Sequence, residues 1–229
     1  MYWQDKDKSK QEYVVPDDIV DVSFKVQCNQ LPLDHAYALS QAIQIALPWI
    51  IDEPQAGMHL IHGAESGNGW IRPQEPDALL SLSRRTRFML RLPKHRITNA
   101  EQLTNKVLDV DGYEVKLSSP QQKLLSPLST IYSRYIITEN IDDEEAFLNQ
   151  AAELLEREGI RVKKMISGLA HVLRMPDKDL YTRSLMIDNL EIEESVYLQQ
   201  QGLGDGKKVG CGLFLPHKGI DAVGQAQEK

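Results

Sequence analysis

Residues 130–158, TIYSRYIITENIDDEEAFLNQAAELLERE, decide the fold of the second half of this sequence. The first nine of these residues are rich in β-branched and aromatic side chains, which is typical of a strand. Four acidic residues, 142–145, then precede an apolar stripe at helical spacing, and Gly159 follows it. Acidic side chains stabilise the positive end of a helix dipole and glycine ends helices, so the pattern predicts a helix over 142–158. The stripe consists of Ala146, Phe147, Ala151, Leu154 and Leu155.

The rest of the second half continues this alternation. Residues 161–173 and 180–190 predict a pair of strands around Pro176, residues 192–201 a helix, and residues 209–215 a final strand. Strand, helix, strand, strand, helix, strand is the order of a ferredoxin-like unit, in which two helices cover one face of a four-stranded antiparallel sheet.

The first half shows the same order with weaker signals. Pro48 ends a helical pattern, and Asp111-Gly112 is a strong hairpin signal. The elements expected here are strands over 19–26, 58–62, 79–92 and 107–110, and helices over 31–47 and 99–103.

We therefore predict an α+β fold of two tandem ferredoxin-like (βαββαβ) domains, each of ordinary domain size. The expected organisation is a flexible arm 1–16, a first domain 17–119, a linker 120–127, a second domain 128–220 and a tail 221–229.

Composition excludes several classes of protein. The 229 residues carry 26 Lys and Arg against 33 Asp and Glu, a net charge of −7, which excludes a uniformly basic coat. No apolar run approaches the roughly 18 residues of a membrane span, so we expect no membrane partner. Cys28 and Cys211 stand far apart without a CxxC pair, which favours reduced thiols in the cytoplasm and argues against structural zinc.

The charge is unevenly distributed along the chain. The segments 84–96, 159–174 and 206–220 contain no acid, and together these 44 residues carry +13, so the remaining 185 carry −20. For any one segment a solvated face is a sufficient explanation. Three such segments together favour a surface that binds a polyanion.

Five glycines lie between positions 202 and 212. A Walker loop requires Ser or Thr after Gly206-Lys207, where this chain has Lys208. A Rossmann loop joins a strand to a helix, whereas this one follows a helix. The glycines serve either a tight connection or close approach of the backbone to phosphate, with Lys207 and Lys208 beside it.

The segment QQGLGDGKKVGCGL, residues 200–213, resembles the glycine-rich loop of the CRISPR-associated repeat-RNA endoribonucleases of the RAMP superfamily. Further segments are similar to the subtype first described in myxobacteria, and the resemblance covers nearly the whole chain after the arm. They are LPLDHAYALSQAI (31–43), HLIHGAESGNGW (59–70), RLPKHR (91–96) and SPLSTIYSRY (126–135).

This resemblance implies two ferredoxin-like domains and cleavage of precursor CRISPR RNA within its repeats. Relatives cut without metal or other cofactor: a 2′-hydroxyl attacks the adjacent phosphate and leaves a 2′,3′-cyclic phosphate. The implied partners are the 3′ stem-loop of the mature crRNA and other subunits of an effector complex. The alternative is a non-catalytic subunit of the same fold that only binds the crRNA.

Histidine suits the proton transfers of such a reaction because its pKa of about 6.5 lies near working pH. His35 lies in the first turn of the first predicted helix, where a helix N-terminus favours a neutral imidazole and attracts phosphate. The resemblance places a catalytic histidine in this helix, so it points to His35, with Tyr37 as a second polar group. His62, at the end of a predicted strand, is the alternative base.

The RNA-binding candidates come from the basic segments and the glycine loop. They are Arg84, Arg85, Arg87, Lys94, Arg96, Arg161, Lys163, Lys164, His171, Arg174, Gly204, Gly206, Lys207, Lys208 and Gly210.

Overall fold

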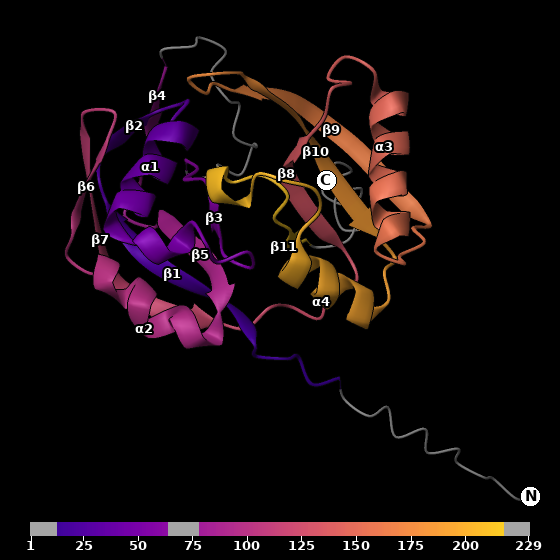
Figure 1. Ribbon diagram of the computed structural model, residues 1–229, viewed down its shortest axis with the longest axis horizontal. Coiled ribbons are helices and arrows are strands. Elements are labelled where there is room, and N and C mark those ends of the chain that lie inside the picture. Colours follow the sequence, from indigo (N-terminus) through magenta and orange to yellow (C-terminus); the bar gives the residue numbers. More distant parts are fainter. Residues whose placement is uncertain (1–12, 64–77, 218–229) are drawn as a thin grey trace, which may run out of the picture.

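The computed structural model describes residues 13–63 and 78–217, and its two larger antiparallel sheets lie side by side (Figure 1). Most of the predicted arm and all of the predicted tail lie outside the described residues. The helices pack on the sheets, and both halves have the ferredoxin-like strand order, so the fold is the predicted tandem of two ferredoxin-like units.

The first sheet has the order β3-β5-β1-β7-β6, with all its neighbours antiparallel. The ferredoxin-like core is β3-β5-β1-β7, and β6 extends its edge through the predicted Asp111-Gly112 hairpin, where both residues have positive φ. Its elements are β1 (Ile19–Gln27), α1 (Ala36–Ala46), β3 (Gly57–His59), β5 (Arg87–Pro93), α2 (Ile97–Ala100), β6 (Val107–Val110) and β7 (Tyr113–Lys123). A two-stranded sheet of β2 (Gln30–Pro32) and β4 (Leu79–Ser81) lies beside it.

The second sheet has the order β11-β8-β10-β9. Helix α3 begins at Asp143, whose carboxylate accepts a hydrogen bond from the Ala146 amide at 2.9 Å, and Gly159 follows its end with φ of 76°. Its elements are β8 (Ile131–Ile137), α3 (Glu144–Arg157), β9 (Lys164–Leu173), β10 (Leu180–Asp188), α4 (Ile192–Gln201) and β11 (Leu215–Pro216).

The two halves share buried contacts. Tyr135, Leu173 and Cys211 of the second half belong to the apolar core of the first. Arg91, from one of the predicted basic segments, is fully buried in β5 and forms a two-point ion pair with Asp21 at 2.9 Å. Its guanidinium also donates to the carbonyls of Gln199 and Phe214, so Arg91 joins the halves and is not part of an exposed basic face.

Several predicted elements differ from the structure. The strand expected over 79–92 is divided into β4 and β5, because Thr86 turns back to Ser83 between them. The strand expected over 209–215 is replaced by a short 3-10 turn, η4 (Lys207–Val209), and by β11, because left-handed glycines bend this segment. Strand β7 also extends to Lys123, into the predicted linker.

The first helix is shorter than predicted. The pattern over 31–47 includes β2 and a bend, and the helix itself begins at Ala36, with His35 as the residue before it. Its buried residues are Ala36, Leu39, Ser40, Ala42 and Ile43.

Candidate functional site

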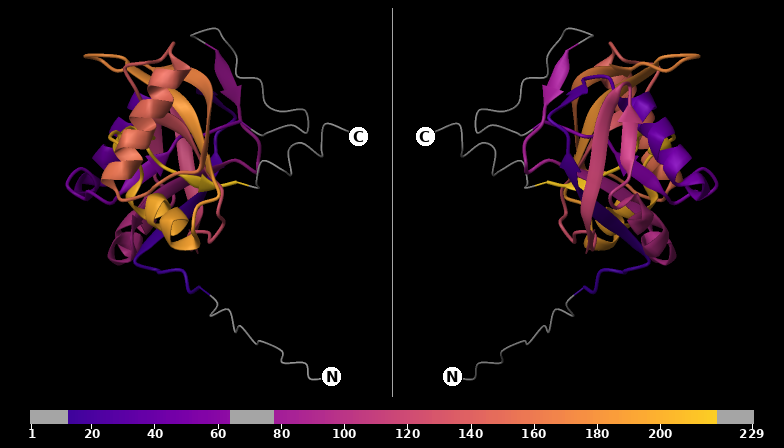
Figure 2. Two further views of the ribbon diagram at one scale, coloured as in Figure 1. Left: turned by 90° about the vertical axis from the view of Figure 1, so that its right-hand side faces the viewer. Right: turned by 90° about the vertical axis from the view of Figure 1, so that its left-hand side faces the viewer.

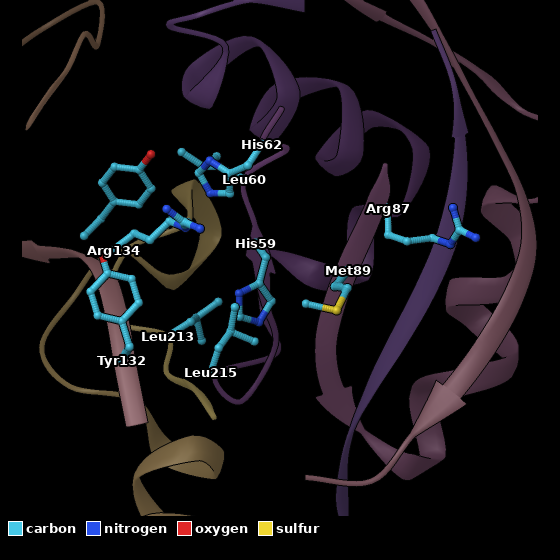
Figure 3. Close-up of a pocket in the computed structure, with 11 residues that line it drawn as sticks. His59, Leu60, His62, Arg87, Met89, Tyr132, Arg134, Leu213 and Leu215 are labelled. Atoms are coloured by element: carbon cyan, nitrogen blue, oxygen red, sulfur yellow. The ribbon is translucent and has the colours of Figure 1, made fainter. Parts of the chain in front are cut away.

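A cavity of about 130 Å³ lies where the first sheet, β8 and the glycine loop meet (Figure 3). The segment from β3 to His62 supplies one side, β5 supplies Met89, and β8 supplies Tyr132 and Arg134. The cavity therefore combines elements of both halves of the chain. Its lining residues are His59, Leu60, His62, Arg87, Met89, Tyr132, Arg134, Tyr135, Gly210, Leu213 and Leu215.

Aromatic rings and one guanidinium gather at the side of this cavity where His62 lies. The His62 ring is stacked on Tyr135 with 6.0 Å between ring centroids. His171 of β9 meets the same tyrosine edge-on at 5.4 Å. Arg134 lies over the Tyr132 ring, 5.8 Å from its centroid, and Figure 3 shows its side chain directed toward the part of the cavity where His62 lies. Two imidazoles thus contact one tyrosine, with a cation beside them.

His59 forms another part of the wall and differs from His62. Its Nε2 is buried without a hydrogen-bond partner among the described residues and lies 4.0 Å from Oδ1 of Asp21. Burial and the nearby Arg91 guanidinium lower the pKa of His59 to about 4, against the smaller opposing effect of Asp21. His59 is therefore neutral near pH 7.

His35, the first catalytic candidate, is 2% exposed. Its Nε2 accepts a hydrogen bond from the Ile61 amide at 3.2 Å, so Nδ1 carries the proton and donates to the Pro32 carbonyl at 2.8 Å. Both ring nitrogens are thus bonded to backbone, and one of these bonds holds the residue next to His62. His35 does not line the cavity, nor does Tyr37, which is 39% exposed on α1.

The glycine loop packs against the same segment. At Gly210, where φ is 90°, a Cβ would come within 2.6 Å of Leu60. At Gly206, with φ of 84°, it would come within 2.8 Å of Ile137. The Gly212 amide donates to the Tyr135 carbonyl at 2.7 Å. These contacts explain the need for small residues in the loop, and they fit the tight connection that the sequence left as one of two alternatives.

The two loop lysines are directed toward protein carbonyls. Lys207 Nζ donates to Gln201 at 2.8 Å. Lys208 Nζ donates to Ala56 at 2.6 Å and also to Glu53, while the Lys208 carbonyl accepts from Ser40 at 2.7 Å. Burial, with a smaller contribution from Lys207, lowers the pKa of Lys208 to about 8. Lys208 therefore fastens the loop to the first half.

Of the other RNA-binding candidates, Arg87 and Gly210 line the cavity and His171 contacts Tyr135. The Arg87 guanidinium extends away from the histidines in Figure 3 and donates to the carbonyls of Arg84 and Thr86. Arg84, Arg85, Arg161, Lys163 and Gly204 are exposed outside the cavity.

The remaining basic candidates are in ion pairs. Lys94 contacts Asp17, and Arg96 contacts Glu53 and lies 5.0 Å from the Trp49 ring centroid. Lys164 lies 3.3 Å from Asp188, and the Arg174 guanidinium lies 3.9 Å from Asp34. The acidic partners in these pairs neutralise part of the positive charge of the three basic segments.

Sequence reasoning missed Tyr132, Arg134 and Tyr135. The signal was present, because alternate positions of a strand face the same side and Tyr132 and Arg134 are two apart in the strand predicted over 130–138. Both are half-buried in β8, as expected of polar side chains on a face that is only partly covered.

Within residues 13–63 and 78–217, no three His, Cys, Asp or Glu side chains come close enough together to hold a metal ion. In the same part of the chain, no helix is both long and apolar enough to cross a membrane.

Comparison with known proteins agrees with the resemblance found in the sequence. The family model described as Cas6 Crispr matches residues 20–219. The CRISPR-associated endonuclease Cas6 of Myxococcus xanthus (strain DK1622) is 30% identical over 197 residues, which cover 86% of this chain and 81% of that protein.

Figure 2 shows the fold of this chain in two further views. Two solved structures have the same fold. One, described as an RAMP protein binding different RNA substrates, has a TM-score of 0.60 at 12% identity and covers 87% of this chain and 100% of its own. A CRISPR-associated protein Cas6 has a TM-score of 0.58 at 11% identity, with the same coverage. From the family match and the M. xanthus relative, the chain belongs to the Cas6 family of CRISPR-associated endonucleases.

Proposed function

We propose that this protein cleaves CRISPR precursor RNA within its repeats, without a metal ion, and leaves a 2′,3′-cyclic phosphate and a 5′-hydroxyl. The observation that carries the proposal is the cavity in which His62 and Arg134 come together, in a chain of the Cas6 family. Metal-free cleavage of RNA requires proton transfer and stabilisation of the phosphorane charge, which an imidazole and a guanidinium can supply.

The reaction is an attack of a ribose 2′-oxygen on the adjacent phosphorus. A neutral His62 accepts the proton of the 2′-hydroxyl as the new P–O bond forms. Arg134 stabilises the negative charge that develops on the phosphorane oxygens. The bond to the 5′-oxygen then breaks, and this oxygen leaves with a proton. His171, which meets Tyr135 edge-on, is the second imidazole at the site and a candidate for supplying that proton.

We assign the base to His62 rather than to His35, the first candidate from the sequence. A general base needs a ring nitrogen that the substrate can reach. Both nitrogens of His35 are bonded to backbone in a buried position, whereas His62 lines the cavity. His35 is then a positioning residue, since it holds the Ile61 amide next to the base.

The exposed basic residues bind the phosphates of the RNA. Arg84 and Arg85 lie in the turn before β5, and Arg161 and Lys163 precede β9. An A-form repeat hairpin is recognised largely through its phosphates and shape, which suits such a surface. We propose that the protein stays on the 3′ stem-loop after cleavage and joins other effector subunits in that state.

The test is cleavage of the repeat RNA of the host's own CRISPR array in EDTA. We expect one cut per repeat and a 2′,3′-cyclic phosphate end, identified by mass spectrometry. RNA with a single 2′-deoxyribose immediately 5′ of the cut should bind equally well and remain intact. Cutting of this deoxy substrate, or a requirement for Mg²⁺, would contradict the mechanism.

The same assay separates the enzyme from a non-catalytic subunit. Wild-type protein that binds the repeat tightly but leaves it intact would favour the subunit. In either case affinity should fall steeply between 50 and 200 mM salt, on the order of 10²-fold or more for several phosphate contacts.

A further inference from the structure

The cavity contains more than the groups that the reaction requires. Much of its wall is apolar, with Leu60, Met89, Leu213 and Leu215. Rings of Tyr132, Tyr135 and the two histidines border it. A phosphate would find no partner among these aliphatic side chains, whereas a flat heteroaromatic ring would pack well against them. The chemistry of this wall therefore points to a base rather than to the RNA backbone.

The volume limits the size of such a base. A protein cavity of roughly 150 Å³ lined by aliphatic and aromatic side chains accommodates one benzene molecule. The cavity here is about 130 Å³, so its size matches one six-membered ring better than a fused two-ring system.

His59 supplies a polar group to this wall. Its ring is neutral near pH 7, and its Nε2 lacks a hydrogen-bond partner among the described residues. A neutral imidazole has one donor and one acceptor nitrogen, and a buried polar atom without a partner requires an explanation. A polar edge of a nucleobase, with a small rotation of the ring, would supply the missing partner.

We propose that the cavity receives one unpaired pyrimidine base of the RNA, next to the cleaved phosphate. This inference rests on the proposed function. The base enters between Met89 and Tyr132, and its own phosphate then lies beside His62 and Arg134. Insertion of this base fixes the cut position, because only one phosphate reaches the reacting groups when the cavity is filled.

The experiment is an abasic scan. Repeat RNAs carry a single abasic spacer at each of the four nucleotides on either side of the cut, and kcat/KM is measured for each. For wild-type protein, we expect one position to lower kcat/KM by about 10-fold or more, the size of one lost base–aromatic stack. A purine at that position should be disfavoured to a similar extent.

Met89→Trp fills the cavity, and Met89→Leu keeps it open. Met89→Trp should cleave intact RNA about as slowly as wild type cleaves the critical abasic RNA, and the abasic spacer should then have no further effect. For Met89→Leu, the abasic spacer at the critical position should still lower kcat/KM relative to this variant's own value on intact RNA. Val107→Trp, which adds the same side chain at an exposed position of β6, controls for the new tryptophan.

If wild-type protein cleaves these RNAs and no abasic position lowers kcat/KM, the inference of a base pocket is overturned and the proposed function is not. Additive effects of Met89→Trp and the spacer would also overturn that inference, because the two changes would then act at different places. If wild-type protein cuts none of the intact RNAs, the proposed function itself fails.

Discussion

Two short regions each carry a histidine near the glycine loop, and they use it in opposite ways. At the start of α1, the His35 ring is enclosed and both of its nitrogens are bonded to backbone. At the end of the segment that follows β3, the His62 ring lines a cavity and stacks on a tyrosine of the other half. The two regions are joined by one hydrogen bond, from the Ile61 amide to His35. The comparison teaches that access to the cavity, more than a place at a helix N-terminus, is what a histidine needs if it is to act on RNA.

The largest expected effect is on His62. His62→Ala should lower the rate of cleavage by about 10²–10⁴-fold, the range for loss of a general base, while the affinity for repeat RNA stays within about 2-fold. Single-turnover cleavage and filter binding measure the two quantities. Added imidazole should restore part of the rate of His62→Ala and none of that of His35→Ala. Rescue of His35→Ala but not of His62→Ala would show that His35, and not His62, is the base.

His35→Ala should instead act mainly on stability. It leaves the buried Ile61 amide without its acceptor and removes a packed ring, so we expect a loss of about 2–4 kcal/mol in the free energy of unfolding. Urea denaturation measures it. Where the variant is folded, the apparent pKa on the acidic side of its pH–rate profile should be that of wild type, because the base is unchanged. A shifted or missing acidic limb would show that His35 itself titrates in the reaction.

The contrast between the regions also explains what could be predicted from the sequence. Periodicity identified both helices of the second half closely, because their amphipathic patterns and the Gly159 that follows the first of them are local signals. The glycine loop was identified by composition, yet Lys208 donates to the carbonyl of Ala56, which lies 152 residues away in the sequence. No local pattern reports such a partner.

The same reason limited the prediction of the site. His35 stood out because a helix N-terminus is visible in sequence, but the backbone amide that occupies its Nε2 is 26 residues further along. Arg91 belonged to a basic segment, and only the register of β1 with β5, which pairs it with Asp21, shows that it is buried in an ion pair. To predict Tyr132 and Arg134 as site residues, one would have to know which face of β8 remains open. Partners brought by tertiary contacts therefore decide which predicted residues are chemically available.

In the wall of the cavity, His59 should make stability depend on pH. Its folded pKa of about 4 lies below the ordinary 6.5, so between these values the unfolded chain binds more protons and stability rises with pH. The full contribution is present above about pH 6.5 and is lost as the pH falls toward 4. The loss amounts to at most about 3 kcal/mol.

Urea midpoints at pH 7, 6, 5 and 4.5 measure this dependence. Since Asp21 and Arg91 face His59, the matched variant is His59→Gln, which keeps the neighbouring ion pair and removes the titration. The variant should have a flatter dependence than wild type over pH 4.5–6.5. Parallel curves would show that His59 is not the group responsible.

Gly210→Ala should have a moderate effect, because it acts on the loop that packs against the His62 region. An alanine there must adopt φ near 90° and place its Cβ against Leu60, at a cost of about 2 kcal/mol. Cleavage should slow together with the loss of stability, since the loop packs beside His62. Gly112→Ala, which has a φ of 80° but open space around its Cβ, is the control for backbone strain alone. A larger defect in cleavage for Gly210→Ala than for Gly112→Ala is expected.

The smallest expected effect is at Tyr37, on the exposed side of the His35 region. Its side chain does not line the cavity, so Tyr37→Phe should change kcat/KM and stability by no more than about 2-fold and 0.5 kcal/mol. Tyr132→Phe, within the cavity, removes the same hydroxyl and serves as the matched comparison. A loss of 10-fold or more on Tyr37→Phe, with Tyr132→Phe unaffected, would place the reacting phosphate at the start of α1. His35 would then be the base, because it is the one histidine at the start of α1 in the described part of the chain.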